Sequence, residues 1–424
     1  MKKLISIVLV VFILLAFTNC SVSSNRKDAS IPEAPPQSIS EPAPRDELQE
    51  RAEAILNKMT LEEKIGQLLV VGFPQDTKDE VIADYIDRYK VCGFILFRRN
   101  YANFDTQYSL VKNLKTRNSL KNPLPLFIAV DEEGGTVSRL PKGGTHFPDA
   151  KLVGKAGDLG LTAKSGEVIG QELKASGINL NFAPVLDIVD SSENKLLIKR
   201  SYGSSAEAVT SHGTAFISGL QSEGVIASPK HFPGHGATNV DSHGKLPVIN
   251  IDKTTFEGRE LLPFKAAIEQ GLDTVMVGHL AYPKLDPSGL PATMSQYFLT
   301  DILRKELGFT GIAISDEIEM YGYMNGKASL EECVVASFNA GLDVFVVGHT
   351  KKIQDRVFSA LKDACSKGGI TEERLNESVM RIIKVKLKHK LSDKMEYSLE
   401  EARDIFGSKE HMAILQELNK AIQK

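Results

Sequence analysis

Residues 311–316 read Gly-Ile-Ala-Ile-Ser-Asp and show the pattern that decides the fold. An apolar run rich in β-branched residues is typical of a strand buried on both faces, and here an ionisable residue follows at once. Ionisable residues follow five such runs, at Asp131, Asp187, Lys230-His231, His279 and Asp316. Because the carboxyl ends of the strands of a parallel barrel lie on one face, we expect these residues to converge there.

Outward from this stretch, eight strand-like runs alternate with stretches of helical period between about Lys64 and Lys362. The expected strands are Gly66–Gly72, Gly93–Phe97, Leu126–Val130, Leu180–Val185, Gly224–Ser228, Thr274–Gly278, Gly311–Ser315 and Asp343–Gly348. The clearest helices are Val81–Tyr89, Thr106–Arg117, Thr162–Ala175, Ala206–Glu223, Leu262–Glu269, Leu299–Leu307, Leu330–Ala340 and Ile353–Lys362. This count predicts an α/β fold, a single (β/α)8 TIM-type barrel with a C-terminal helical extension. An open doubly wound sheet is the alternative, but it suits five or six such units, and no G-x-G-x-x-G follows the first strand.

The two ends of the chain differ from the middle. Lys2 and Lys3 precede an apolar run over residues 4–17, and Cys20 follows it, so residues 1–20 resemble a bacterial lipoprotein signal peptide with Cys20 as the lipidation site. Asn19 is unusual before such a cysteine, which leaves a plain cleaved signal or an uncleaved anchor as alternatives. Residues 21–45 are rich in Pro and Ser and predict a tether. We assign residues 46–390 to the barrel and 391–424 to a helical C-terminal tail.

The composition excludes several classes of function. The 424 residues include 51 Lys and Arg against 54 Asp and Glu, a net charge of −3, so nucleic acid is not an expected partner. Four widely spread cysteines without a C-x-x-C pair suggest neither a structural zinc nor a disulfide framework. His231 and His235 have the spacing of zinc ligands on a helix, but Pro233 and Gly234 between them break a helix. We expect no metal or organic cofactor.

Two groups carry the expected chemistry. Asp316 comes directly after an apolar strand, where a rigidly held carboxylate can attack an anomeric carbon; a cap for the following helix is the structural alternative. Glu317 and Glu319 compete with it for this role. Asp241 and His243 are two residues apart on a glycine-flanked loop, so the carboxylate can orient the imidazole and raise its pKa, which makes it a usable proton donor.

These motifs carry a resemblance to a known family. The stretches concerned are residues 131–135 (DEEGG) with Arg139, residues 230–236 (KHFPGHG), residues 241–243 (DSH) and residues 315–320 (SDEIEM). From about residue 60 to 388 the chain resembles glycoside hydrolase family 3, specifically its β-N-acetylhexosaminidase branch. The resemblance implies that Asp316 is the nucleophile and His243, paired with Asp241, the acid/base. It places substrate contacts at Asp131, Arg139, Arg200, Lys230, His231 and His279. Glu132 and Thr136 depart from the family's usual Gln and Arg.

The resemblance therefore implies a retaining enzyme that removes terminal, non-reducing β-linked N-acetylglucosamine from cell-wall fragments or other glycans. Its expected partners are a carbohydrate substrate, such as a GlcNAc-containing glycan or a muropeptide, and the membrane, through an N-terminal lipid anchor. The export signal predicts a periplasmic or cell-surface location. The alternatives are another family 3 β-glycosidase, such as a β-glucosidase or β-xylosidase, and a surface lipoprotein that binds glycans without cleaving them.

Overall fold

Eight short parallel strands form the centre of the structure. The computed structural model describes residues 46–424 apart from 239, 241–243 and 325–327. Within these residues the strands are β1 (Leu69–Val71), β2 (Gly93–Ile95), β3 (Phe127–Val130), β4 (Leu180–Asn181), β5 (Ile226–Ala227), β6 (Thr274–Val277), β7 (Ile312–Glu317) and β8 (Val344–Val347). They are hydrogen-bonded in the order β5-β4-β3-β2-β1-β8-β7-β6, and the ladders between them are parallel.

The segment after β5 closes the barrel onto β6. The backbone N–H of Phe232 donates to the carbonyl of Met276 at 2.9 Å, and the N–H of Met276 donates to the carbonyl of Pro229 at 3.0 Å. Phe232 forms a parallel bridge with Val277. The predicted (β/α)8 barrel is therefore confirmed, and the open doubly wound sheet is wrong.

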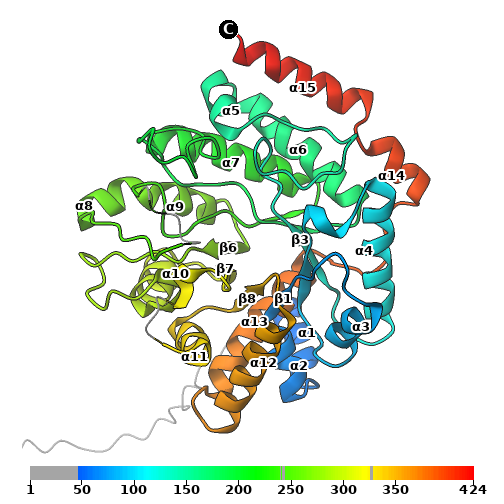
Figure 1. Cartoon of the computed structure of the whole chain (residues 1–424), viewed down its shortest axis with the longest axis vertical. Coiled ribbons are helices and arrows are strands. Elements are labelled where there is room, and N and C mark those ends of the chain that lie inside the picture. Colours follow the sequence, from blue (N-terminus) through cyan, green and yellow to red (C-terminus); the bar gives the residue numbers. More distant parts are fainter. Residues whose placement is uncertain (1–45, 239, 241–243, 325–327) are drawn as a thin grey trace, which may run out of the picture. The chain divides into compact units, whose positions relative to one another are not determined.

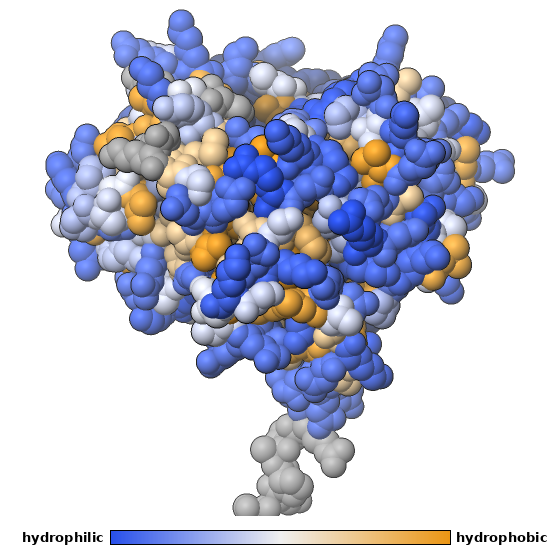
Figure 2. Space-filling model, turned by 60° about the horizontal axis from the view of Figure 1, so that its bottom comes forward, coloured by the Kyte–Doolittle hydropathy of each residue, from blue (hydrophilic) through white to orange (hydrophobic). Residues whose placement is uncertain are grey.

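Helices surround the strands, as Figure 1 shows, and they present a mainly hydrophilic surface, with smaller hydrophobic areas, on the face seen in Figure 2. The α-helices among the described residues are α1 (Glu47–Leu56), α2 (Leu61–Gly66), α3 (Asp79–Asp87), α4 (Phe104–Ser119), α5 (Ala150–Ala156), α6 (Leu159–Ala175), α7 (Ala206–Ser222), α8 (Lys253–Thr255), α9 (Leu262–Glu269), α10 (Tyr321–Met324), α11 (Leu330–Ala340), α12 (Lys351–Ser366), α13 (Glu372–Lys388), α14 (Leu399–Ile405) and α15 (Lys409–Ile422). Two 3-10 helices in the described residues are η1 (Arg98–Asn100) and η3 (Ala292–Met294), and two π-helices are η2 (Phe256–Glu260) and η4 (Tyr297–Glu306). No helix in this part of the chain is long and apolar enough to cross a membrane.

Several strands are shorter than the sequence predicts, for local reasons. The first expected strand begins at Leu69 because Thr60 and Glu63 form a reciprocal capping box that starts α2 and makes Leu61–Gly66 helical. β4 and β5 have only two residues each. Pro184 and Pro229 follow them closely, and proline has no N–H to donate to a ladder.

Strand β7 carries a bulge at its carboxyl end. Ile314 pairs with Val344, but the next pair is Glu317 with Val346, so β7 has one more residue than β8 over this stretch. The hydroxyl of Ser315 accepts the N–H of Val346 at 2.9 Å and replaces the missing backbone acceptor. Asp316 therefore lies inside β7, not after it as the sequence pattern suggested.

The C-terminal helices α14 and α15 pack against the outer helices of the barrel, on the side of α4, α5 and α6 (Figure 1). The buried carboxylate of Glu172 on α6 accepts the N–H of Gly407 at 3.0 Å and contacts Nδ1 of His411 at 3.0 Å. Phe406 stacks on Phe104 with ring centroids 4.2 Å apart. Residues 46–424 form one compact unit, and the tail belongs to it.

Candidate active site

One cavity of about 400 Å³ opens at the carboxyl ends of the strands. Asp131 follows β3, Lys230 and His231 follow β5, and Asp316 lies at the end of β7; all four line this cavity. Of the other predicted contacts, Arg139 and Arg200 also line it. The expected convergence of strand-end residues is therefore confirmed for this group.

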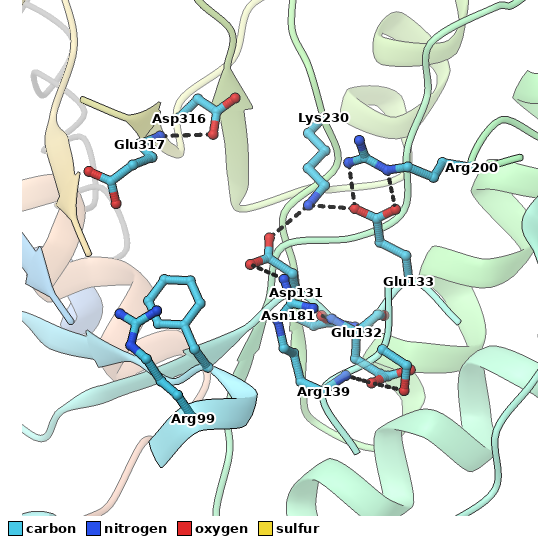
Figure 3. Close-up of polar contacts among 12 residues, drawn as sticks. Arg99, Asp131, Glu132, Glu133, Arg139, Asn181, Arg200, Lys230, Asp316 and Glu317 are labelled. Atoms are coloured by element: carbon cyan, nitrogen blue, oxygen red, sulfur yellow. Dashed lines mark hydrogen bonds and ion pairs between the residues drawn. The ribbon is translucent and has the colours of Figure 1, made fainter. Parts of the chain in front are cut away.

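An ion-pair network occupies one wall of the cavity (Figure 3). The ammonium of Lys230 lies 2.7 Å from Oδ1 of Asp131 and 2.7 Å from Oε1 of Glu133. Arg200 donates to both oxygens of Glu133, at 2.7 and 2.8 Å, and Arg139 lies 3.7 Å from Asp131. Burial alone would raise the pKa of Glu133, but Lys230 and Arg200 lower it to about 2. Glu133 is therefore ionised at neutral pH, which argues against its role as a proton donor.

Asp187 organises the two histidines of the 230–236 segment from behind the wall. Its Oδ2 lies 2.6 Å from Nδ1 of His231, and its Oδ1 accepts the backbone N–H groups of His231 at 3.2 Å and His235 at 2.7 Å. Burial raises the pKa of this carboxyl, yet the two histidines hold it below its usual range. A carboxylate only accepts hydrogen bonds, so Nδ1 of His231 carries a proton and Nε2 points to the cavity.

Asp316 is the carboxylate best placed for nucleophilic attack. Its side chain is 20% exposed, its Oδ1 accepts the N–H of Glu317 at 2.8 Å, and its Oδ2 lies 4.0 Å from Nε2 of His231. Burial opposes ionisation, but His231, His279 and the Glu317 N–H hold the pKa of Asp316 below its usual range. Helix α10 begins only at Tyr321, so the hydrogen bond of Asp316 to its neighbour is not a helix cap.

The two competing carboxyls, those of Glu317 and Glu319, accept hydrogen bonds from the backbone of the segment after β8. Glu317 accepts the N–H of Gly348 at 2.6 Å, and Glu319 accepts those of His349 at 3.0 Å and Thr350 at 2.8 Å. Burial, with the charges of Glu319 and Asp316, raises the pKa of Glu317 to about 8. Figure 3 shows its side chain directed away from that of Asp316.

Glu132 supports the loop that carries Arg139. Its Oε2 accepts the backbone N–H groups of Arg139 at 2.5 Å and Leu140 at 2.9 Å. Burial raises the pKa of Glu132 to about 7 although these N–H groups oppose the shift. Glu132 is not among the residues that line the cavity in the described part of the chain, so it positions a neighbour and does not reach a ligand there.

Four predicted residues are placed differently or lie outside the described residues. His279 is fully buried behind β7, where Nδ1 contacts Oγ1 of Thr293 at 3.0 Å and Nε2 the carbonyl of Glu317 at 3.0 Å; it is not among the lining residues. The proposed acid/base pair, Asp241 and His243, lies outside the described residues, as does Cys20.

Other functional residues received no role from the sequence. Asp187 followed the fourth strand, so its position was visible, but its contact with His231 was not. Asn194 was missed entirely; its side chain donates to the carbonyls of Gly236 at 3.3 Å and Thr238 at 2.8 Å and holds the start of the segment that leads to residues 241–243. Only such long-range contacts, which one sequence does not reveal, could identify it.

The donor geometry does not fit a metal centre within the residues described. No group of three or more His, Cys, Asp and Glu side chains is arranged there to hold an ion. His231 and His235, the pair with zinc-like spacing, have ring centroids 5.8 Å apart at 69°, and His231 is bound to Asp187. The site instead combines an ionised aspartate with a paired set of charges suited to sugar hydroxyls. Glycoside hydrolases are one class of enzyme built on such a barrel with a strand-end carboxylate.

The comparisons with known proteins agree with this class. Residues 60–385 match the family described as "Glycosyl hydrolase family 3 N terminal domain". The chain therefore belongs to glycosyl hydrolase family 3, which confirms the resemblance seen in its motifs.

Two relatives and one solved structure of similar sequence carry glycosidase names. The chain is 34% identical over 360 residues to beta-hexosaminidase A of Pseudoalteromonas piscicida, covering 80% of this chain but only 59% of that protein. It is 35% identical to the beta-hexosaminidase of Nitrosomonas eutropha over 64% of this chain and 78% of the relative. A family 3 beta-N-acetylglucosaminidase from Paenibacillus sp. superposes with a TM-score of 0.80 at 35% identity, covering 86% of this chain and 69% of the other.

Proposed function

We propose that this glycosidase removes terminal, non-reducing β-linked N-acetylglucosamine with retention of configuration. The observation that carries the proposal is the ionised Asp316 at the carboxyl end of β7, facing a cavity whose other wall holds the Lys230–Asp131 pair. The relatives named beta-hexosaminidase and the similar beta-N-acetylglucosaminidase structure support this sugar over glucose or xylose.

In the proposed mechanism, Asp316 attacks the anomeric carbon and forms a glycosyl-enzyme. His243, protonated and oriented by Asp241, gives its proton to the leaving oxygen. The neutral imidazole then activates water for the second displacement. The pKa of about 2 at Glu133 supports this assignment, because it disqualifies a carboxyl that would otherwise compete for proton donation.

The ion-pair network is the proposed binding site for sugar hydroxyls. Asp131 accepts from a hydroxyl, while Lys230 donates to one, and Arg139 completes this group; Arg200 acts through Glu133, to which it is doubly bonded. His231 presents Nε2 beside Asp316, where it can reach a hydroxyl near the anomeric carbon. His279 acts from behind β7 through the carbonyl of Glu317 and through its charge on Asp316.

A comparison of two substrates tests the proposed activity. The purified protein should hydrolyse a chromogenic β-N-acetylglucosaminide much faster than the matching β-glucoside, and NMR of the first product should show the β-anomer. A preference for the glucoside would favour the other family 3 specificities. Binding of chitooligosaccharides without hydrolysis of either substrate would favour a glycan-binding lipoprotein.

We also propose that the enzyme is exported and held at a membrane by a lipid on Cys20, and that it trims cell-wall fragments or other glycans outside the inner membrane. The support is the basic start, apolar run and cysteine of residues 1–20, followed by the Pro/Ser-rich stretch to residue 45. Cys20→Ser should move the activity from the membrane to the soluble fraction. If the variant stays in membranes as an uncleaved precursor, the N-terminus is an ordinary anchor.

A further inference from the structure

A second cavity, of about 390 Å³, lies at the opposite end of the barrel from the active site. Asn179 and Val225 line it and directly precede β4 and β5, whereas Asp131 and Lys230 in the active-site cavity come after β3 and β5. Lys115 of α4 and the segment directly after α13 also line this second cavity. Cavities of this volume hold small organic ligands in many proteins, so the chemistry of the lining decides what it can bind.

Lys115 is a buried cation in the second cavity without a close partner. The residue is 5% exposed. Its Nζ makes no hydrogen bond or close ion pair with the described residues, yet it is not among the side-chain atoms that are sealed from solvent. Buried polar groups are nearly always hydrogen-bonded, so the N–H groups of this ammonium indicate a partner that enters the cavity.

The surroundings of Lys115 favour a charged partner over water. Burial lowers the pKa of Lys115 to about 8, although the charges of Asp393 and Glu396 oppose the shift. Asp393 does not bond to the lysine, because its carboxylate accepts the side-chain amide of Asn118 at 2.6 Å and the N–H of Leu126 at 3.0 Å. Water can accept the N–H groups of a buried ammonium but brings no opposite charge, whereas an anion supplies both.

The other charged groups of the second cavity are partly paired with each other. Its lining contains four lysines and two glutamates, which are Lys115, Lys174, Lys390, Lys394, Glu223 and Glu396. Lys174 lies 2.9 Å from Oε1 of Glu396 and also interacts with the charge of Glu223. His389 lines the cavity as well, but its Nε2 lies 2.7 Å from Oδ2 of Asp273. The pairing therefore uses both glutamates and leaves an excess of positive charge.

This excess suits a phosphate group. Lys390 and Lys394 are exposed and have no carboxylate partner in the described part of the chain. Four lysines against two glutamates leave two positive charges, and a phosphate monoester carries about −1.5 to −2 at neutral pH. No arginine is among the described residues that line the cavity. Lysine binds phosphate as a point charge, whereas arginine is the usual two-point ligand of a carboxylate.

We propose that the second cavity binds a phosphate-bearing anion, with Lys115 at its inner wall and Lys390 and Lys394 at its rim. The anion is either a free phosphorylated molecule or the headgroup of a phospholipid, since both present the same charged oxygens. The site is separate from the residues that cleave the glycosidic bond, so the proposal does not depend on the sugar specificity. A bound anion contacts α4 and the segment after α13 together, and it should therefore stabilise the fold.

The test compares the wild type with Lys115→Met, which keeps the length of the side chain and removes its charge. Inorganic phosphate at about a hundred times its Kd should raise the melting temperature of the wild type by roughly 2–4 °C, and potassium chloride of equal ionic strength should not. Lys115→Met should lose most of this shift and keep the wild-type kcat/KM. Without phosphate it should melt at or above the wild-type temperature, because the variant removes an unpaired buried charge. Phosphate bound at the active site would shift both proteins alike.

Lys386→Met is the matched control. Lys386 is also a buried lysine, but its Nζ donates to Oε1 of Gln67 at 2.8 Å and to the carbonyl of Cys92 at 3.0 Å. It is not among the described residues that line the second cavity. This variant should lower the melting temperature, because two hydrogen bonds are lost, and keep the full shift produced by phosphate.

Acylation tests the site in the wild type without a substitution. A small acylating reagent at pH 8 should modify Lys115, and saturating phosphate should slow that modification at least threefold, as measured by peptide mass spectrometry. Modification of Lys58, which is exposed on the turn after α1, should not change. Equal phosphate shifts in the wild type and Lys115→Met, or no protection of Lys115, would overturn a soluble phosphate as the ligand.

Vesicles distinguish the two sources of phosphate. The full chain is sedimented with phosphatidylcholine vesicles that contain or lack phosphatidic acid. Extra sedimentation with phosphatidic acid that disappears in Lys115→Met would assign a phospholipid headgroup, and its absence beside a Lys115-dependent phosphate shift would assign a free molecule. If neither phosphate nor these vesicles give an effect that depends on Lys115, the proposal is wrong.

Discussion

The contact between Asp187 and His231 can be tested quantitatively, because Asp187→Asn removes a charge and barely changes the side chain's shape. The amide oxygen can still accept the backbone N–H groups of His231 and His235. The amide NH2 then takes the place of Oδ2, which lies 2.6 Å from Nδ1 of His231 in the wild type. Nδ1 must become an acceptor, so the ring proton moves to Nε2, which is the nitrogen that faces Asp316. We expect the imidazole to present the wrong tautomer to the substrate.

The geometry sets the size of the effect. A hydrogen bond to a charged group contributes about 1.5–3 kcal/mol, which corresponds to a loss of roughly 10- to 150-fold in kcat/KM if it fixes the active tautomer. A similar loss of stability, about 2–3 kcal/mol, lowers the melting temperature of a chain of this size by roughly 2–4 °C.

The assay compares kcat/KM and melting temperature for wild type, Asp187→Asn and a matched pair elsewhere. Asp273 and His389 form such a pair before β6, with Nε2 of His389 2.7 Å from Oδ2 of Asp273, away from the lining of the cavity. Asp273→Asn should lower the melting temperature and leave kcat/KM within threefold. If Asp187→Asn retains kcat/KM within threefold while His231→Gln abolishes it, the carboxylate does not control the tautomer and the reasoning is wrong.

Three further predictions concern the chemistry. Asp316→Asn should lower kcat by about a thousandfold or more while thermal stability changes by no more than about 1 kcal/mol; near-wild-type turnover would remove Asp316 from the nucleophile role. Since the pKa of Asp316 is held low, activity should persist below the usual range of an aspartate and fall as pH drops through that lowered pKa. His279→Gln removes one of the lowering charges, so the acidic limb of kcat/KM should move to higher pH, and an unmoved limb would contradict the assignment. His243→Ala should reduce turnover of a disaccharide much more than the glycosylation step on an activated aryl glycoside, because proton donation matters only for a poor leaving group; equal losses would place the proton donor elsewhere.

The periodicity of the sequence was sufficient for the barrel and for the four strand-end residues Asp131, Lys230, His231 and Asp316 in the cavity, whereas Arg139 and Arg200 came from the family resemblance. Each strand-end cluster was read from a local pattern, and parallel strands bring such clusters together whatever their separation along the chain. Local pattern failed where the outcome depends on a partner strand. The bulge that places Asp316 inside β7 arises from its register with β8, which is visible only after the two strands pair.

The roles of individual histidines and acids were also out of reach of local sequence pattern, because they depend on residues from other strands. His231, His235 and His279 looked alike in sequence, yet their surroundings differ. His231 is bound to Asp187, both ring nitrogens of His235 are buried without a partner among the described residues, and His279 contacts the carbonyl of Glu317. Glu133 is ionised because Lys230 and Arg200 lie against it, and neither contact can be read from the residues beside it in sequence. Ionisation and hydrogen-bond role depend on neighbours from other strands, so sequence can propose the set of residues but not the function of each.

The closure of the barrel and the assembly of the site share one segment of chain. Lys230 bridges to Val185, with its N–H bound to the carbonyl of Pro184 at 3.0 Å, and Phe232 bridges to Val277 on β6. These backbone bonds link β5 to its neighbours where the strands themselves have ended. The same bonds hold the side chains of Lys230 and His231 against Asp131 and Asp187. A lysine and a histidine placed on a ladder, and not on a free loop, would lose little entropy on binding a ligand. The cost is that changes to this segment affect folding and catalysis together, which is why conservative substitutions such as Asp187→Asn separate the two more cleanly than changes at Lys230.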